Sequence, residues 1–303
     1  MQAEGRGKHW FLRAVLGLLI LFLCWSAVEA SMVRLEITEV TLPDLPEAFD
    51  GLRVVFLSDL HIGALSPVSK AEDLAAQLRT LKPDLILLGG DYADFDPFLQ
   101  MRSSREEALI AQAERRDQFF ASLAGIETTL GIYAVAGERD NQLDSRSGVT
   151  LEQAARLGGV TVLRDDAVEL TRNGQKLVIA GVDDWKTGSQ DVRALPEALS
   201  SRDCVVLISH NPDALPPLSA REGADGGAWI DLALTGHLLG GRMTLFGHSA
   251  LYNPSIYQDR FLAGWYREGD APMLISRGVG TPILPLRFFC PPQIHLITLR
   301  RGA

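Results

Sequence analysis

The apolar positions along the chain form short runs and helically spaced sets that predict alternating strands and helices. Runs of consecutive apolar residues predict buried strands at 53–57, 84–88, 131–136, 204–209 and 229–234. Apolar residues at helical spacing predict helices at 69–81, 105–123, 151–157 and 191–199. Shorter runs predict strands at 160–163, 167–171, 176–180 and 293–299, with a hairpin turn at Asn173-Gly174. This alternation predicts an α/β fold with a mixed sheet.

The N-terminal segment differs from the remainder because residues 14–28 carry no charge. Arg6, Lys8 and Arg13 precede this apolar stretch, as in a signal sequence or a membrane anchor. The stretch is shorter than the roughly 20 residues of a spanning helix, although residues 10–12 could extend it. The small residues before Ser31 also fit a cleavage site, so cleaved and retained forms both stay open, with a retained anchor favoured.

We therefore divide the chain into an anchor or signal peptide at 1–30 and a single domain at 31–303. Basic residues on the N-terminal side favour a cytoplasmic N-terminus. This orientation predicts a single-pass protein of the cell membrane with its domain on the extracytoplasmic side, or an exported protein.

Charge narrows the choice of partners. The chain has 29 Lys and Arg against 38 Asp and Glu, a net charge of -9. Nucleic-acid binding usually requires a basic surface, so we expect no nucleic-acid partner. The content of 47% hydrophobic residues is high enough for a large core and argues against disorder.

Metal-ligating residue types follow five of the apolar runs. They are Asp59 and His61, Asp91, Glu138 and Asp140, His210, and His237, and glycine neighbours most of them. Ligands of an open α/β sheet bind beyond the carboxyl ends of its strands. Carboxylates and imidazoles gathered there suit a divalent transition metal better than Ca²⁺. One such residue alone is more often a helix cap or a structural group, but five in this order predict a metal site.

The order of these motifs resembles that of the calcineurin-like metallophosphoesterases. Their pattern is Asp-x-His, Gly-Asp, Gly-Asn-His-Asp/Glu, a single His, and Gly-His-x-His. The resemblance extends from about Leu52 to Leu299 and is greatest to a bacterial membrane-linked subgroup, because Gly181–Asp184, Ser209–Asp213 and Leu284–Pro292 match motifs of that subgroup. It implies a four-layer α/β/β/α sandwich with two mixed sheets, preceded here by an N-terminal hydrophobic helix.

The resemblance also implies a set of metal ligands. In the family, two divalent ions share one aspartate, which corresponds to Asp91. The first ion would bind Asp59, His61 and the second His of Gly-His-x-His. The second ion would bind the motif Asn, His210 and His237. The expected cofactors are one or two ions of Mn, Fe, Zn or Mg, and the expected substrate is a phosphorylated small molecule or lipid.

The sequence departs from the family pattern at three positions. Glu138 replaces the Asn ligand, Arg139 replaces the catalytic His, and Leu239 replaces the second His of Gly-His-x-His. Glutamate can still bind a metal, whereas leucine cannot. Arginine stays protonated and can hold a phosphate, but it cannot act as a general acid. These changes predict that the second ion, with Asp91, Glu138, His210 and His237, has the better site.

Three interpretations follow from the departures. The protein is a divergent hydrolase of phosphoesters or pyrophosphates with a weakened dinuclear site, in which Arg139 and Asp140 are the candidate catalytic residues. Alternatively, it is a membrane-anchored pseudoenzyme that binds a metal or a phosphoryl ligand without turnover, or a structural scaffold with residual ligands. We favour the enzyme, because most of the ligand positions are retained.

Overall fold

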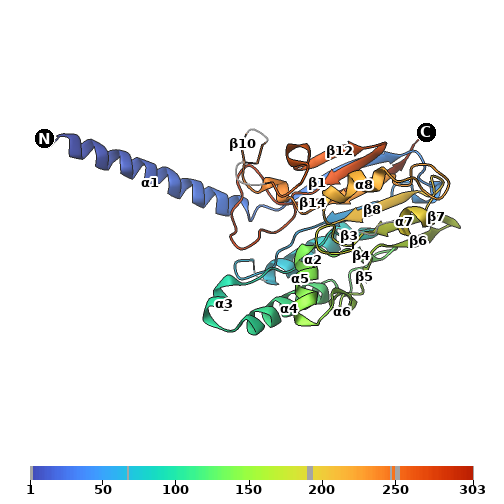
Figure 1. Cartoon of the computed structure of the whole chain (residues 1–303), viewed down its shortest axis with the longest axis horizontal. Coiled ribbons are helices and arrows are strands. Elements are labelled where there is room, and N and C mark those ends of the chain that lie inside the picture. Colours follow the sequence, from blue (N-terminus) through green and yellow to red (C-terminus); the bar gives the residue numbers. More distant parts are fainter. Residues whose placement is uncertain (1–2, 67, 190–193, 246–247, 250–252, 303) are drawn as a thin grey trace.

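The computed structural model describes residues 3–66, 68–189, 194–245, 248–249 and 253–302, and in these ranges it contains two six-stranded mixed sheets (Figure 1). The first sheet has the order β1-β14-β2-β3-β4-β5, with strands β1 Arg34–Leu42, β14 Gln293–Arg301, β2 Arg53–Leu57, β3 Leu85–Leu88, β4 Ile132–Ala134 and β5 Thr161–Val162. The second has the order β12-β13-β9-β8-β7-β6, with strands β12 Gly264–Glu268, β13 Ala271–Ile275, β9 Leu232–Thr235, β8 Val205–Ser209, β7 Gln175–Gly181 and β6 Asp166–Arg172. A small hairpin adds β10 Thr244–Leu245 and β11 His248–Ser249.

Helices cover the outer faces of the two sheets, and one further helix, α1, projects from the domain. Their bounds are α1 Ala3–Glu29, α2 Val68–Leu81, α3 Pro97–Arg102, α4 Arg105–Ser122, α5 Glu138–Ser147, α6 Leu151–Arg156, α7 Ala194–Ala198 and α8 Leu215–Ser219. One apolar cluster joins the first sheet to α2, α4 and α6, a second lies between the sheets, and a third joins the second sheet to α7 and α8. This arrangement confirms the predicted α/β/β/α sandwich.

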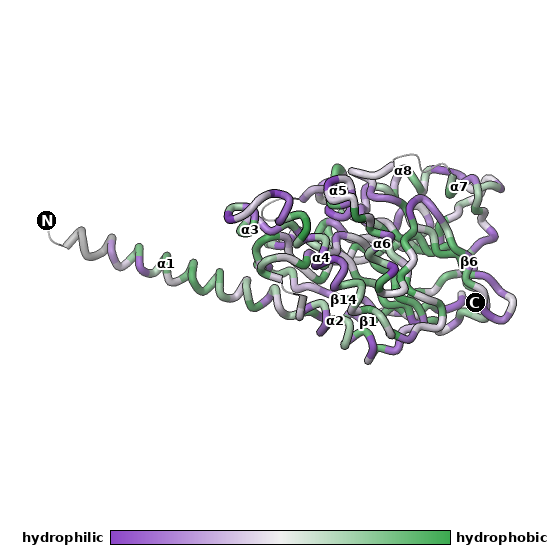
Figure 2. Tube along the Cα trace, turned by 90° about the horizontal axis from the view of Figure 1, so that it is seen from below, coloured by the Kyte–Doolittle hydropathy of each residue, from purple (hydrophilic) through white to green (hydrophobic). Residues whose placement is uncertain are grey.

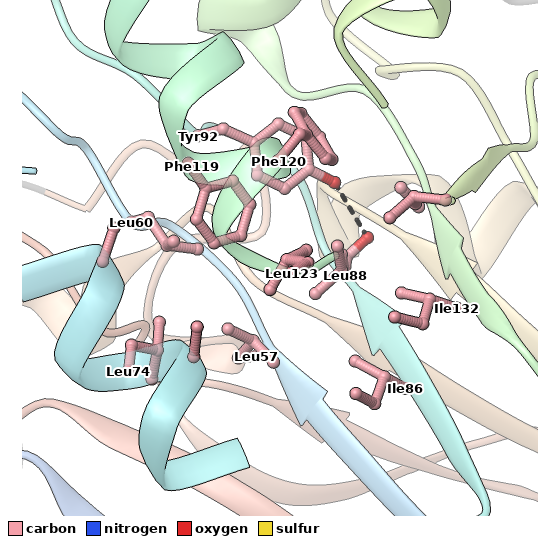
Figure 3. Close-up of a cluster of buried hydrophobic side chains, with 14 of the residues drawn as sticks. Leu57, Leu60, Leu74, Ile86, Leu88, Tyr92, Phe119, Phe120, Leu123 and Ile132 are labelled. Carbon is pink, nitrogen blue, oxygen red and sulfur yellow. Dashed lines mark hydrogen bonds between the residues drawn. The ribbon is translucent and has the colours of Figure 1, made fainter. Parts of the chain in front are cut away.

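Aromatic packing fixes the outer helices against the first sheet (Figure 3). Tyr92 follows β3 and stacks on Phe119 of α4 at a centroid distance of 5.6 Å. Its hydroxyl donates to the carbonyl oxygens of Leu88 and Val135, at 3.2 and 2.8 Å. A buried hydroxyl needs such partners, so Tyr92 ties the loop after β3 to the end of β4 and thereby steadies the ligand loops.

Most of the predicted elements are present, and the differences have local causes. The stretch that begins at Glu138 forms a ten-residue helix that we did not predict, because its sequence is strongly polar. The strand predicted at 229–234 begins only at Leu232. The predicted helix at 191–199 is described from Ala194, and its first three positions lie outside the described residues.

Strand directions place the candidate site at the same end of the molecule as α1. Strand β14 runs parallel to β1, and β2 runs antiparallel to β14. Strands β3 and β4 run parallel to β2. The carboxyl ends of β2, β3 and β4 therefore lie at the edge where β1 begins, just after α1 ends (Figure 1).

Helix α1 projects away from the domain, and only its C-terminal turns, from Phe22 onward, are packed against it (Figures 1 and 2). Its segment His9–Glu29 spans 21 residues with a mean hydropathy of 2.3, which is long and apolar enough to cross a membrane. A signal sequence has the same properties. Ser26 and Glu29 are buried against the domain, while Trp10 and Leu18 of the same helix are exposed.

Candidate metal centre

The candidate ligands lie in turns directly after buried strands. Asp59 and His61 follow β2, Asp91 follows β3, and His237 follows β9. All four have positive φ angles, of 54°, 44°, 58° and 68° respectively. This backbone conformation is unfavourable for residues with a side chain, and it concentrates at functional sites in proteins. The fold therefore holds these side chains in place at an energetic cost.

Asp59, His61 and Asp91 form a buried group that can hold a metal ion. One ligand atom from each lies within 4.8 Å of the other two, and this is the metal-binding group found in the described part of the chain. His61 Nε2 lies 3.9 Å from Asp59 Oδ1 and 3.7 Å from Asp91 Oδ2. Its Nδ1 faces Asp94 Oδ2 at 4.0 Å. A ligating imidazole commonly directs its other nitrogen toward a carboxylate in this way.

Glycines allow other loops to approach the two carboxylates closely. A Cβ atom on Gly137 would lie 2.3 Å from Asp91 Oδ1, and one on Gly236 would lie 2.4 Å from Asp59 Oδ2. A side chain at either position would displace a ligand. The glycines that precede Glu138 and His237 are therefore part of the construction of the site.

His210 and His237 form a second pair beside Asp91. Nδ1 of His210 donates to the Gly89 carbonyl at 2.7 Å, which directs its Nε2 into the site. That Nε2 lies 3.5 Å from Asp91 Oδ2 and 3.1 Å from His237 Nδ1. The backbone N–H of His237 donates to Asp59. The two imidazoles are thus brought to the site but contact each other.

Glu138 is engaged with residues other than the candidate ligands. Its Oε2 accepts from Lys186 Nζ at 3.0 Å, and its Oε1 accepts from Gln142 at 2.9 Å. Our prediction that the second ion has the better site rested partly on this carboxylate. The gathered group of Asp59, His61 and Asp91 leads us to propose the opposite ranking. The added charge of Glu138 is offset by Lys186.

Arg139 and Asp140, the two predicted catalytic residues, have different surroundings. The Arg139 side chain is 36% exposed, and its Nε lies 3.5 Å from Asp94 Oδ1. Asp140 is buried, and its carboxylate accepts from the backbone N–H groups of Asp91 and Gly137 at 2.8 and 2.9 Å. Asp140 therefore positions the ligand loops, whereas Arg139 can reach a bound substrate.

The pKa values of the site reflect burial and mutual charge. Burial raises the pKa of Asp59. Burial also acts to raise the pKa of Asp91, but the charges of His210 and His61 hold that pKa well below its usual value. Burial and the neighbouring Asp91 raise the pKa of Asp140 to about 7. Asp91 therefore stays ionised, as a metal ligand must be.

The two histidines of the second pair shift in opposite directions. Burial acts to lower the pKa of His210, but the charge of Asp91 raises it well above the ordinary value. Burial and the charge of His210 lower the pKa of His237 to about 3. These opposite shifts favour the charged form of His210 and the neutral form of His237, and an imidazole must be deprotonated at the nitrogen that binds a metal.

Leu239 lies next to the first group of ligands. Leu239 is buried, and both it and Asp59 pack against Gly278. A Cβ atom on Gly278 would lie 3.1 Å from Leu239 Cδ2 and 2.6 Å from Asp59 Cβ. Leucine cannot bind a metal, so the group has three protein ligands where the family pattern has four. Three ligands at a buried sheet edge are the composition of an open metal site.

The residues present fit a divalent cation. Two carboxylates and one imidazole are donors that Mn²⁺, Fe²⁺, Zn²⁺ and Mg²⁺ accept to differing degrees. The Nδ1 atom of His61 is buried without a hydrogen-bond partner among the described residues, which suits an imidazole whose orientation a bound ion would fix.

Two residues of the site were not predicted from sequence. Asp94 faces both His61 and Arg139, and its only signal is its place three residues after Asp91. Lys186 pairs with Glu138 across 48 positions of sequence. It follows the Gly181–Asp184 motif, but its direction could not be read from the chain.

Comparison with known proteins identifies the family. The model for the calcineurin-like phosphoesterases matches residues 52–241, and the chain belongs to this family of metallophosphoesterases. It is 30% identical over 272 residues to "Uncharacterized metallophosphoesterase YkuE" of Bacillus subtilis, covering 88% of this chain and 86% of that protein. It is 28% identical over 247 residues to "Phosphodiesterase YaeI" of Escherichia coli, covering 82% of each.

Among solved structures, a dimetal phosphatase from Danio rerio matches with a TM-score of 0.45 and 13% identity. This match covers 76% of the chain and 88% of the zebrafish protein.

Proposed function

We propose that this protein is a membrane-anchored, metal-dependent hydrolase of phosphodiesters or pyrophosphates that are linked to lipids. The observation that carries the proposal is the buried group of Asp59, His61 and Asp91, at the sheet edge next to α1. These three residues would hold a divalent cation, which would supply Lewis-acid activation of a phosphate oxygen and of a water. The family of the chain and the name of its relative, a phosphodiesterase, support this chemistry.

The other residues near the group bind and position the substrate. Arg139 carries a permanent charge at the rim and would hold phosphate oxygens. Arg242 lies near Asp94, whose charge acts on it, and would provide a second cation. Asp140 keeps the loops of Asp91 and Gly137 in place. Because Arg139 replaces a titratable histidine, we expect no general acid at that position, and good leaving groups should react fastest.

The attachment of α1 supports a retained anchor over a cleaved signal. The Glu29 carboxylate accepts from the backbone N–H groups of Phe289 and Cys290. Ser26 O accepts from the N–H of Arg287 at 3.0 Å. Cleavage after Ala30 would remove both acceptors and leave these N–H groups unpaired, which is costly where they are buried. Together with the basic residues in the N-terminal part of α1, this favours a domain on the extracytoplasmic side.

The position of the site supports a lipid-linked substrate. The carboxyl ends of β2, β3 and β4 face the end of the domain from which α1 projects. Helix α3 lies at the same end in both views, and its Phe98 and Met101 are exposed (Figures 1 and 2). A domain held by α1 would present this end, with the two exposed apolar side chains and the site, to the membrane surface.

Binding without turnover is the second candidate function, since Arg139 and Leu239 replace a catalytic residue and a ligand. The test loads the full chain in detergent with Mn²⁺, Zn²⁺, Fe²⁺ or Mg²⁺ and assays monoesters, diesters and pyrophosphates, both soluble and lipid-linked. We expect turnover, highest on a lipid-linked diester or pyrophosphate, that Asp91→Asn abolishes.

The matched control is Asp231→Asn, which alters a carboxylate at the beginning of β9, opposite the site. This variant should keep the wild-type turnover. Bound metal without turnover on any substrate would support the binding protein instead. A chain that binds none of the four metals would contradict both functions.

A further inference from the structure

A pocket outside the candidate metal centre opens beside the attachment of α1. It has a volume of about 500 Å³, and its lining includes Gly240, Leu245, Leu262, Arg277, Phe289 and Cys290. The pocket therefore lies between the hairpin of β10 and the C-terminal segment that precedes β14. No residue of the candidate metal centre is part of this lining.

The pocket is continuous with the contact between α1 and the domain. The N–H groups of Phe289 and Cys290, both in the lining, donate to Glu29 of α1. The ring of Phe288 packs against Phe22 of α1 at a centroid distance of 4.8 Å. If α1 spans a bilayer, the pocket therefore lies at the membrane surface, where the helix emerges from the bilayer.

The rim of the pocket is apolar and exposed. Phe289 is 63% exposed and Leu245 is 50% exposed. Ile283 and Leu284, a few residues before Phe289, are also exposed. Trp25, near the end of α1, is half exposed and donates to Glu29. Tryptophan at this level of a spanning helix is typical of the membrane–water interface, and the apolar rim suits the same environment.

One cation in the lining, Arg277, has no side-chain partner among the described residues. The Arg277 side chain makes no hydrogen bond or ion pair within residues 3–66, 68–189, 194–245, 248–249 and 253–302, and its stem lies against Gly240. Arg287, ten residues later, is fully buried and donates to several backbone carbonyls, including that of Arg277. The two arginines thus differ: Arg287 holds the C-terminal segment together, and Arg277 is available to a ligand.

We propose that this pocket binds the phosphate of an anionic phospholipid head group, with Arg277 as its cation and Leu245 and Phe289 in contact with the acyl region. The continuity of the pocket with α1 identifies the bilayer as the source of the ligand. Basic residues next to a spanning helix recognise anionic lipids in this manner. The proposal rests on α1 lying in a membrane, which is part of the proposed function, and it requires no catalysis.

The test is retention of lipid by the full chain, measured by native mass spectrometry from micelles that contain equal amounts of phosphatidylglycerol and phosphatidylcholine. We expect wild-type protein to retain phosphatidylglycerol preferentially. Arg277→Gln should lower the ratio of retained phosphatidylglycerol to phosphatidylcholine about fivefold, and Arg277→Lys should recover much of it. Neither metal nor substrate is added, so the result does not depend on whether the protein is an enzyme.

The matched control is Arg267→Gln on β12, which removes the same charge elsewhere on the domain, where Arg267 donates to the Asp270 carbonyl. It should leave the ratio unchanged. Equal ratios for wild type and Arg277→Gln, or an equal fall in Arg267→Gln, would overturn the proposal. Thermal stabilisation of wild type but not of Arg277→Gln by soluble glycerol phosphate would mean that the site takes a soluble phosphate, and would also overturn it.

Discussion

The two halves of the candidate metal centre differ in what their side chains already contact. Asp59, His61 and Asp91 gather around one point within 4.8 Å. The second half contains His210, His237 and Glu138, but the imidazoles contact each other and the carboxylate pairs with Lys186. The half that lacks a ligand at Leu239 is thus the better prepared one. The number of candidate ligands is a poorer guide to metal affinity than the partners those ligands already have.

The largest expected effect comes from the residue that both halves share. Asp91→Asn removes the charge that faces His61 and His210. Loss of a residue that only hydrogen-bonds to a metal ligand typically costs about 10–100-fold in metal affinity or activity. We therefore expect loss of the ligand itself to lower turnover and metal affinity by more than about 100-fold. Turnover and metal content measured on the same preparation check this. A variant that keeps its metal would place the ion away from Asp91.

Single imidazole deletions test the asymmetry between the halves. His61→Ala should weaken binding of the tightest ion by about 100-fold, whereas His237→Ala should weaken it by less than about tenfold. Calorimetric titration with Mn²⁺ measures both, and the increase in melting temperature on adding the metal gives an independent reading. The reverse order would show that the second half holds the tight ion.

Addition of the missing ligand sharpens the comparison. Leu239→His introduces an imidazole beside Gly278, against which Asp59 also packs. We expect Mn²⁺ affinity to rise about tenfold or more, because a fourth donor completes the first group. Leu239→Gln is the control, because glutamine is similar to histidine in size and polarity, and this variant should not raise the Mn²⁺ affinity. Equal behaviour of the two variants would mean that position 239 does not reach the ion.

The smallest effect is expected at Glu138. Because Lys186 and Gln142 already hold its carboxylate, Glu138→Gln should change metal affinity by less than about threefold. Its effect on stability should stay within about 1 kcal/mol, as for other solvent-exposed ion pairs. Lys186→Gln should raise the affinity of a second ion by freeing the carboxylate. A large loss of metal affinity in Glu138→Gln would contradict this expectation and show that Glu138 is a metal ligand.

Much of the fold could be predicted from sequence, because buried strands such as 53–57 and 204–209 are unbroken apolar runs. Strand β1 was not predicted as a strand. It alternates only weakly, and its partner β14 lies about 260 positions away in the chain. Helix α5 was missed because Leu143 is its only apolar residue and because a glycine directly precedes it. Pairing over long separations and helices without an apolar face leave little local signal.

The gathering of Asp59, His61 and Asp91 could be predicted from sequence, but the partners of the other candidate residues could not. Strand ends followed by Asp59, His61 and Asp91 gave a sufficient pattern, since parallel strands bring such residues to one edge. The pairing of Lys186 with Glu138 depends on where a separate loop places one side chain. The attachment of Glu29 to the C-terminal segment likewise joins residues 260 positions apart.

Anomalous diffraction from crystals of the Mn²⁺-loaded full chain tests the central claim most directly, because it locates the ion that binds most tightly. The account predicts a strong peak enclosed by Asp59, His61 and Asp91, with a weaker second peak, or none, beside His210 and His237. A strong peak beside His210 and His237 with none at Asp59 and His61 would contradict it.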